Sequence, residues 1–146
     1  MIKIQHSTIH GTGVFAAVNL SQGQQIGTYQ GKRYTERQAA RRDWNQALTY
    51  VFGLSDGSLI DASEGGNETR HLNHSCEPNC EAQEETGPRG RLSIAFYALR
   101  DVRAGDELFI DYSLIVDEPD SEAAFRCACG SRVCRGSMLA PRAAQG

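Results

Sequence analysis

The chain of 146 residues has the length of one globular domain with a sizeable core. Hydrophobic residues make up 40% and charged residues 23%, and no stretch approaches the ~20 apolar residues of a membrane-spanning helix. The net charge of -3 argues against a broad basic face that binds nucleic acid directly. We therefore expect a soluble protein without membrane or nucleic-acid partners, with a monomer favoured.

Short strands separated by turns are predicted for most of the chain. They cover residues 14–18, 25–29, 50–54, 58–60, 91–99 and 107–112. The third and fourth of them flank residues 55–57, Ser-Asp-Gly, which is typical of a hairpin turn. In the fifth, Leu92, Ile94 and Phe96 alternate and share one face. Residues 68–73 are expected to form one short helical turn.

One longer helix is predicted from Thr35 to Leu48. Thr35 and Gln38 form a capping box, in which each side chain satisfies a backbone N–H at the helix start. Trp44, Ala47 and Leu48 recur at helical spacing, so Trp44 is interpreted as a core anchor.

Acidic residues gather in two places, at residues 81–85 and 117–122. The simpler interpretation is a pair of solvated loops, and the alternative is attraction of a basic peptide. Residues 117–126 are predicted to be a linker, and residues 140–146 a flexible tail.

Three cysteines near the end of the chain, Cys127, Cys129 and Cys134, have the spacing of an incomplete zinc site. Structural zinc takes four ligands, and thiolates are favoured. The remaining cysteines, Cys76 and Cys80, are candidates for the fourth ligand. The odd number of cysteines favours zinc over disulfides. The N-terminus has no apolar stretch of the kind found in signal peptides, so we expect an intracellular protein.

His71 and His74 are rival fourth ligands from the same polar segment. In each case the metal would hold the C-terminal segment against residues 70–80, about fifty residues upstream. This polar segment is therefore a candidate binding site.

Three separated segments complete the pattern. Residues 10–15 contain Gly-Thr-Gly, residues 66–79 contain Asn-His-Ser-Cys-x-Pro-Asn, and residues 105–112 end in Asp-Tyr. In this order, and followed by the cysteine triplet, they resemble the SET-domain protein lysine methyltransferases over about residues 1–139. The resemblance implies a SET domain at residues 1–116 and a post-SET zinc-binding segment at residues 127–139.

The family implies a β-rich α+β fold of small curved sheets with a pseudoknot and a C-terminal zinc clip. In the pseudoknot, the Asn73–His74 segment and the Asp111–Tyr112 segment pass through one another, which is rare in proteins. The implied cofactor is S-adenosylmethionine, and the implied reaction is methyl transfer to a lysine side-chain amine. A basic protein or peptide, such as a histone tail, is the expected substrate.

The resemblance also assigns cofactor contacts. Gly11 and Gly13 match a loop whose backbone borders the cofactor. Asn73 and His74 match the pair that contacts its amino-acid and adenine parts. Leu139 lies where the family often has an apolar residue over the adenine.

Tyr112 matches the family's catalytic tyrosine, whose hydroxyl places the methyl group of the cofactor, and Tyr50 matches a tyrosine that lines the lysine channel. Cys76 matches the fourth ligand of a structural zinc, together with the three C-terminal cysteines. Asp61 and Arg70 match structural positions.

Two positions depart from the family's pattern. Lys32 follows Gly31 where the family often has glutamate, and Ile110 stands where it usually has phenylalanine or tyrosine. These departures keep open the alternative of a non-catalytic SET-like module that binds a peptide. A further alternative is a structural domain that is held together by zinc and binds no cofactor.

Overall fold

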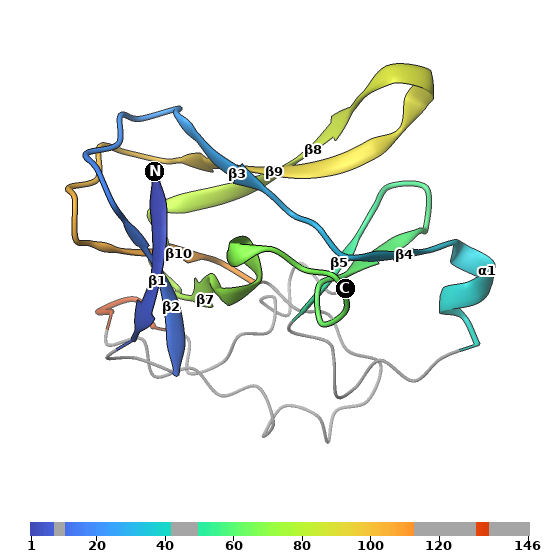
Figure 1. The fold of residues 1–146 in the computed structure, drawn as a ribbon, viewed down its shortest axis with the longest axis horizontal. Coiled ribbons are helices and arrows are strands. Elements are labelled where there is room, and N and C mark those ends of the chain that lie inside the picture. Colours follow the sequence, from blue (N-terminus) through green and yellow to red (C-terminus); the bar gives the residue numbers. More distant parts are fainter. Residues whose placement is uncertain (8–10, 42–49, 113–130, 135–146) are drawn as a thin grey trace.

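The computed structural model describes residues 1–7, 11–41, 50–112 and 131–134. Three small β-sheets form the body of this part of the chain (Figure 1). The first sheet lies at one side, the third lies at the other side next to the short helix α1, and the second spans the space between them. Among the described residues, no helix has the length and apolar character needed to cross a bilayer.

The first sheet has the strand order β1-β2-β10-β7. Its strands are β1 (Ile2–His6), β2 (Thr12–Ala16), β7 (Asn73–His74) and β10 (Glu107–Ile110). β2 pairs antiparallel with both β1 and β10, whereas β10 pairs in parallel with β7. The sheet therefore joins three parts of the chain that lie far apart in sequence.

The second and third sheets have three strands each, in the orders β3-β9-β8 and β4-β6-β5. The second contains β3 (Gln25–Thr28), β8 (Cys80–Thr86) and β9 (Leu92–Ala98). The third contains β4 (Lys32–Tyr34), β5 (Val51–Gly53) and β6 (Leu59–Asp61). The helices are α1 (Glu36–Ala39) and the 3-10 turns η2 (Glu68–His71) and η3 (Pro88–Gly90).

Several local predictions are confirmed. β5 and β6 form the predicted hairpin around the Ser-Asp-Gly turn, and η2 is the predicted helical turn. The capping box at Thr35 and Gln38 is present at the start of α1. The rest of the predicted helix, residues 42–49 with Trp44, lies outside the described residues.

The interpretation of residues 81–85 as a loop is wrong, because they belong to strand β8. The small residues Cys80 and Ala82 alternate with polar ones and pair with Ala98 and Phe96 of β9. This apolar alternation outweighs the low strand propensity of the glutamates. The predicted strand at 14–18 is also displaced, since β2 begins at Thr12 and ends at Ala16.

An aromatic group forms the centre of the core. The ring of Tyr29 lies 4.6 Å from that of Phe52 and 5.8 Å from that of Phe96, with edge-to-face geometry. Phe96, Ile60 and other apolar side chains from all three sheets are buried around them. The core therefore holds the sheets together and fixes Tyr29, the residue directly after β3.

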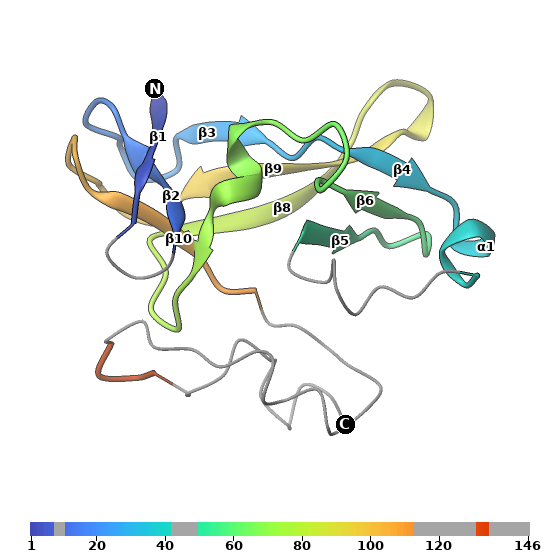
Figure 2. The same cartoon turned by 60° about the horizontal axis from the view of Figure 1, so that its bottom comes forward.

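The pairing of β7 with β10 brings the Asn-His segment beside the strand that leads to Tyr112 (Figure 2). Phe109 lies opposite Asn73 and Ile110 opposite His74. The predicted pseudoknot requires this contact, which is confirmed; the passage of one segment through the other stays a prediction.

The side chain of Asn79 extends this short pairing. Its amide nitrogen donates to the Glu107 carbonyl at 2.9 Å, and its amide oxygen accepts from the Phe109 N–H at 2.8 Å. Asn79 is buried, so both hydrogen bonds are shielded from water. The side chain thus bonds β10 as a neighbouring strand would.

We expect Asn79→Ala to lower the free energy of unfolding by about 2 kcal/mol or more, because it leaves two buried backbone groups of β10 without their partner. Urea denaturation followed by circular dichroism measures the change. Gln83→Ala, at an exposed position of β8, is the control and should change stability by less than about 0.5 kcal/mol. Equal stability of the two variants would contradict the proposed importance of Asn79.

Candidate functional site

Tyr112 lies just after β10 and is held by its backbone N–H and its side-chain hydroxyl. Its backbone N–H donates to Nδ1 of His74 at 2.9 Å, and its hydroxyl donates to the Leu72 carbonyl at 2.5 Å. Its ring also meets the His74 ring edge-on, at 5.4 Å between centroids. Leu72, which lies between η2 and β7, and His74 of β7 therefore fix the position of Tyr112.

Burial raises the pKa of Tyr112 well above its usual value of about 10, and Tyr50 and Glu107 raise it further. The phenol therefore keeps its proton at neutral pH. Because that proton is donated to Leu72, the remaining lone pairs of the oxygen can only accept. Such a group can orient a polarised C–H or N–H, but it cannot act as a base.

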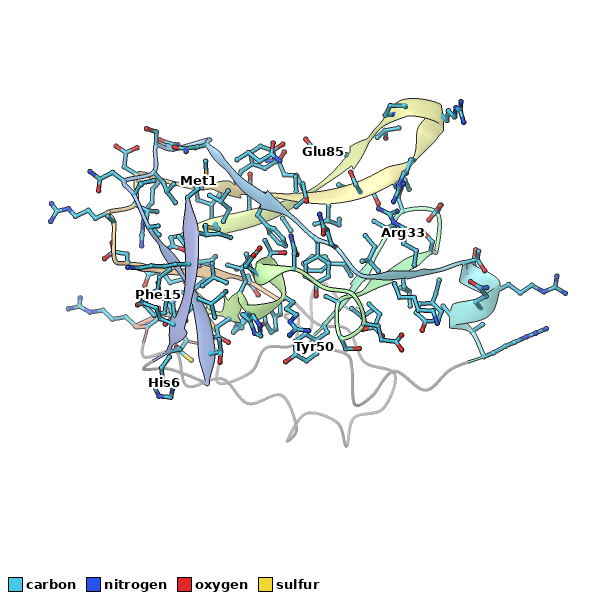
Figure 3. The ribbon with its side chains drawn as sticks, in the orientation of Figure 1. Met1, His6, Phe15, Arg33, Tyr50 and Glu85 are labelled. Carbon is cyan, nitrogen blue, oxygen red and sulfur yellow. The ribbon has the colours of Figure 1, made fainter. Side chains whose placement is uncertain are left out.

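Two further tyrosines lie near Tyr112. Tyr29 donates its hydroxyl to the Tyr50 carbonyl at 2.7 Å, and burial raises its pKa, with a smaller contribution from Tyr112. Tyr50 is 36% exposed, and Figure 3 shows it on the side of the molecule away from Glu85 and the β8–β9 hairpin. The structure thus places Tyr50 close enough to Tyr112 to affect its pKa, and their roles in catalysis stay a prediction.

Sequence reasoning missed Tyr29, which appeared only as the end of a predicted strand. Its closeness to the third sheet comes from its own side chain, whose hydroxyl binds the Tyr50 carbonyl and whose ring meets that of Phe52. An aromatic residue at the end of a strand was the only signal in the sequence.

Gly11 and Gly13 are glycines for different reasons. Gly11 has a positive φ of 48°, and open space surrounds the position of a side chain there. A Cβ atom on Gly13 would overlap the Glu107 carboxylate. Ser7 directly follows β1, and its N–H donates to the Gly11 carbonyl at 2.6 Å. This hydrogen bond ties the end of β1 to the Gly-x-Gly segment. Of the two glycines, Gly11 is therefore the one with free space beside its Cα, as far as the described residues show.

Asn73 lies next to this loop. Its amide nitrogen donates to the Thr12 carbonyl at 3.1 Å and to Oε2 of Glu107 at 3.0 Å. The Ser7 hydroxyl lies 2.7 Å from Oε1 of the same carboxylate. The structure thus brings the Gly-x-Gly segment and Asn73 together, with Glu107 between them, and their contact with a cofactor stays a prediction.

Glu107 was not among the predicted site residues. In the sequence it begins a strand in which Leu108 and Ile110 are apolar. Nothing there distinguishes it from any polar residue at the start of a strand. Its contacts depend on two segments about 34 and 100 residues away. Sequence spacing carries no signal for such contacts.

The hydrogen bonds of His74 determine its tautomer. Nδ1 accepts from the Tyr112 N–H, so it carries no proton, and a neutral ring holds its proton on Nε2. Nε2 lies 3.4 Å from Sγ of Cys76 and therefore faces it as a donor. Asp111 lies 3.6 Å from Nδ1, but we assign no ion pair because the ring is neutral.

Cys76 and Cys134 are both half-buried. Near them, the Ser131 hydroxyl donates to the Glu77 carboxylate at 2.8 Å, which links the described C-terminal residues to the segment after Cys76. Among the residues described, no three His, Cys, Asp or Glu side chains come together as a metal site. Cys127, Cys129 and Leu139 lie outside the described residues.

Cys80 has a different environment. It is 1% exposed, faces the core opposite Ala98, and burial raises its thiol pKa to about 12. A protonated core thiol is a packing residue.

Comparison with known proteins shows the family to which this chain belongs. The model of the SET domain family matches residues 11–113, which include every strand of the site from β2 to β10. The chain belongs to the SET domain family. The expected fold of small sheets with few helices is thereby confirmed.

Curated relatives match nearly the whole chain. A histone-lysine N-methyltransferase, H3 lysine-4 specific, of Emericella nidulans is 34% identical over 94% of this chain and 12% of its own length. The same-named protein of Saccharomyces cerevisiae is 33% identical over 94% of this chain and 13% of its own length. Histone-lysine N-methyltransferase 2B of Homo sapiens is 32% identical over 92% of this chain and 5% of its own length. The chain thus spans only a small part of these relatives.

Solved structures agree. One of ctPRC2 in an autoinhibited conformation bound to S-adenosylmethionine has a TM-score of 0.67 and 27% identity, over 76% of this chain and 15% of the other. A humanized mutant of the Chaetomium thermophilum Polycomb Repressive Complex 2, bound to an inhibitor, gives a TM-score of 0.68, with 27% identity, over 77% of this chain and 15% of the other. The SET architecture of this chain is therefore shared over most of the described residues.

We expect the near-ultraviolet absorbance of tyrosinate to rise later in the native protein than in the denatured one as the pH passes about 10. The reason is that burial raises the pKa of Tyr29 and Tyr112 in the folded state alone. Tyr112→Phe should reduce the lag, because it removes one of the two buried phenols. Coincident native and denatured titrations would contradict the buried phenols.

Proposed function

We propose that this SET domain transfers a methyl group from S-adenosylmethionine to the side-chain amine of a lysine in a protein substrate. The observation that carries the proposal is the buried, protonated Tyr112 phenol, fixed beside His74 and close to Tyr50. The H3 lysine-4 specific names of the relatives and the S-adenosylmethionine in a related structure support it.

The reaction requires a neutral amine, because an ammonium has no lone pair to attack the methyl group. With a reference pKa near ~10.4, only about one lysine in a thousand is neutral near pH 7.4, which costs roughly 4 kcal/mol. Removal from water lowers a lysine pKa by up to ~5 units. The desolvation that raises the pKa of Tyr112 would favour the neutral amine as well, so no dedicated base is needed.

Tyr112 acts as an orienting group in this proposal. Its proton is donated to Leu72, so its oxygen accepts from the polarised methyl group and holds it in line with the incoming nitrogen. Tyr50, partly exposed and close to Tyr112, lines the path by which the lysine side chain enters.

The residues present fit S-adenosylmethionine. The open backbone of Gly11, the Asn73 amide and the His74 ring surround the same end of the first sheet as Tyr112. We assign these residues, together with Gly13 and Leu139, to cofactor binding. Leu139 is the residue we propose to cover the adenine. When bound, the cofactor supplies the activated methyl group, and the protein supplies orientation and desolvation.

A basic protein is the proposed substrate, and a histone tail is the best candidate. The net charge of -3 favours a basic partner, and the relatives are named as histone-lysine methyltransferases. An intracellular location follows from that assignment.

Tyr112→Phe tests the catalytic role. We expect the rate of methyl transfer to fall roughly a hundredfold or more, with equal losses in kcat and kcat/KM, because the hydroxyl acts on the transition state. Calorimetry should show S-adenosylmethionine affinity within a few-fold of the unmodified protein. Tyr34→Phe is the matched control, since Tyr34 lies half-buried on β4, where its hydroxyl donates to Glu64.

The alternatives predict other results. A peptide-binding module would bind peptide without turnover, and a structural domain would bind neither cofactor nor peptide. Lys32, one basis for these alternatives, is exposed and lies over the Tyr34 ring at 5.3 Å. Full activity of Tyr112→Phe would remove Tyr112 from the mechanism.

We also propose a structural zinc held by Cys76, Cys127, Cys129 and Cys134. The four thiolates are a favoured ligand set for zinc, and the hydrogen bond of Ser131 to Glu77 supports a C-terminal segment beside Cys76. Of the rival ligands, Cys80 is a buried core thiol. His74 needs a proton on Nε2, so that nitrogen is suited to support Cys76 as a donor instead.

Metal analysis should give about one zinc per chain, and Cys76→Ser and Cys129→Ser should each lose it. Cys80→Ala is the control: it should lower stability, because it removes a buried side chain, and leave the metal content unchanged. Loss of zinc from Cys80→Ala together with its retention in Cys76→Ser would contradict the assignment.

Ile110 bears on how many methyl groups are added. Its side chain is 4% exposed and lies in the core cluster that Tyr112 adjoins. Isoleucine has no hydroxyl to hold the amine and is smaller than the aromatic residues usual at this position. We therefore propose that the pocket accepts a methylated amine and that the product carries more than one methyl group.

Mass spectrometry after long reaction times tests this proposal. The unmodified protein should give di- or trimethyl-lysine, and Ile110→Tyr should shift the product toward monomethyl-lysine. Ile110→Phe is the matched control, because it adds similar bulk without the hydroxyl, and it should keep multiple methylation. Monomethyl product alone from the unmodified protein would be the contrary result.

A further inference from the structure

Strand β1 forms an open edge of the first sheet (Figure 2). Among the described residues it pairs with β2 on one side and with no strand on the other. At the two ends of this pairing, the Ala17 N–H donates to the Met1 carbonyl at 2.9 Å, and the Ser7 N–H donates to the Gly11 carbonyl at 2.6 Å. The bonding side alternates along a strand, so the odd-numbered residues bond β2 and the even-numbered residues turn their N–H and C=O outward.

The outward residues are Ile2, Ile4 and His6. None of their backbone groups has a hydrogen-bond partner among the described residues. Proteins usually blunt such an edge with a proline, a bulge or several charges, because it invites pairing with another strand. β1 has no proline, its register with β2 is regular, and Lys3 is its only charged side chain when histidine is counted as neutral. The edge is therefore open to a further strand.

Ile4 stands in the middle of this edge. Its side chain is 38% exposed, and it lies on the same face of β1 as Ile2, which packs against the core. Met1, directly before the strand, is 56% exposed. A strand added along β1 would therefore cover apolar surface and also pair the free backbone groups.

We propose that β1 pairs antiparallel with β1 of a second copy of this chain, about a two-fold axis at Ile4. In this register Ile4 faces its own counterpart, and Ile2 faces the partner's His6. All of these residues turn their backbone groups to the edge, so each facing pair exchanges two hydrogen bonds. The same surface is used on both copies, as a two-fold interface requires. The two four-stranded sheets then become one continuous sheet.

This register is the one that suits two copies of the strand. A slip by one residue would set outward groups against residues whose backbone already bonds β2. A slip by two residues in one direction would place Lys3 opposite the partner's Lys3, and like charges directly opposite destabilise a sheet. A slip by two in the other direction would leave Ile2 outside the ladder. In the proposed register Lys3 faces the partner's Gln5.

The dimer is independent of the proposed function, because it rests on the edge of β1 alone. It replaces the monomer that the sequence favoured. Sequence patterns show which side chains share a face of a strand, but they do not show which strand ends a sheet.

Sedimentation equilibrium of the full chain tests the proposal. The mass should rise with concentration from 16.0 kDa toward twice that value. Ile4→Lys should raise the dissociation constant about tenfold or more, because it places two ammonium groups opposite each other across the axis. Leu99→Lys is the matched control: Leu99 is also 38% exposed but lies outside β1, so the dimer should persist. Circular dichroism should show both variants folded, since both positions are exposed.

Ile4→Cys tests the register without adding a charge. Facing residues of a hydrogen-bonded antiparallel pair lie about 5.5 Å apart between Cα atoms, within the ~4.4–6.8 Å that a disulfide spans. Mild oxidation should therefore cross-link Ile4→Cys into a covalent dimer. Lys3→Cys, whose side chain faces the partner's Gln5, should cross-link much less. Non-reducing electrophoresis compares the two variants, with the unmodified protein showing the background from the native cysteines.

Two results would overturn the proposal. One is a monomer at every protein concentration up to about 1 mM, which would mean that water, another part of this chain or a different protein occupies the edge of β1. The other is a dimer whose dissociation constant Ile4→Lys leaves unchanged, because the interface would then lie elsewhere. Equal cross-linking of Ile4→Cys and Lys3→Cys would contradict the two-fold axis at Ile4.

Discussion

The parallel pairing of β7 with β10 is the contact on which the site depends. It joins only two residue pairs, and so short a ladder needs further support. Asn79 supplies two buried hydrogen bonds to β10, and the Ser75 N–H donates to the Ile110 carbonyl at 3.0 Å. Because Asn73 and His74 lie on one strand and Tyr112 follows the other, a slip in this register would move the tyrosine away from the two residues that we propose bind the cofactor.

Burial has one electrostatic consequence for both partners in the proposed reaction. Removal from water disfavours charged forms, so it keeps Tyr112 protonated and would lower the pKa of a lysine that enters beside it. The negative charge of Glu107 adds to the first effect. It opposes the second, because a negative potential favours an ammonium, whereas the sulfonium of the cofactor favours the neutral amine. The proposed chemistry therefore depends on desolvation and the cofactor's charge more than on a base.

The sequence allowed the β-rich fold, the β5–β6 hairpin and the contact of the Asn-His and Asp-Tyr segments to be predicted, because local turn chemistry and a specific family pattern carry that information. It gave no indication of Glu107 or Tyr29, whose roles arise from contacts between distant strands. The acidic strand β8 was mistaken for a loop since its small core-facing residues, Cys80 and Ala82, give a weak alternation. Charge dominated the sequence pattern there, whereas packing decides the structure.

Transfer of labelled methyl groups from S-adenosylmethionine to a set of purified core histones, followed by mass spectrometry of the labelled peptides, tests the central claim most directly. The account predicts label on the side-chain nitrogen of a lysine at a defined position in a basic segment. The label should be lost when S-adenosylhomocysteine blocks the cofactor site. The same assay on whole-cell lysate covers substrates other than histones. Absence of label from every protein in both assays, or label on residues other than lysine, would contradict the account.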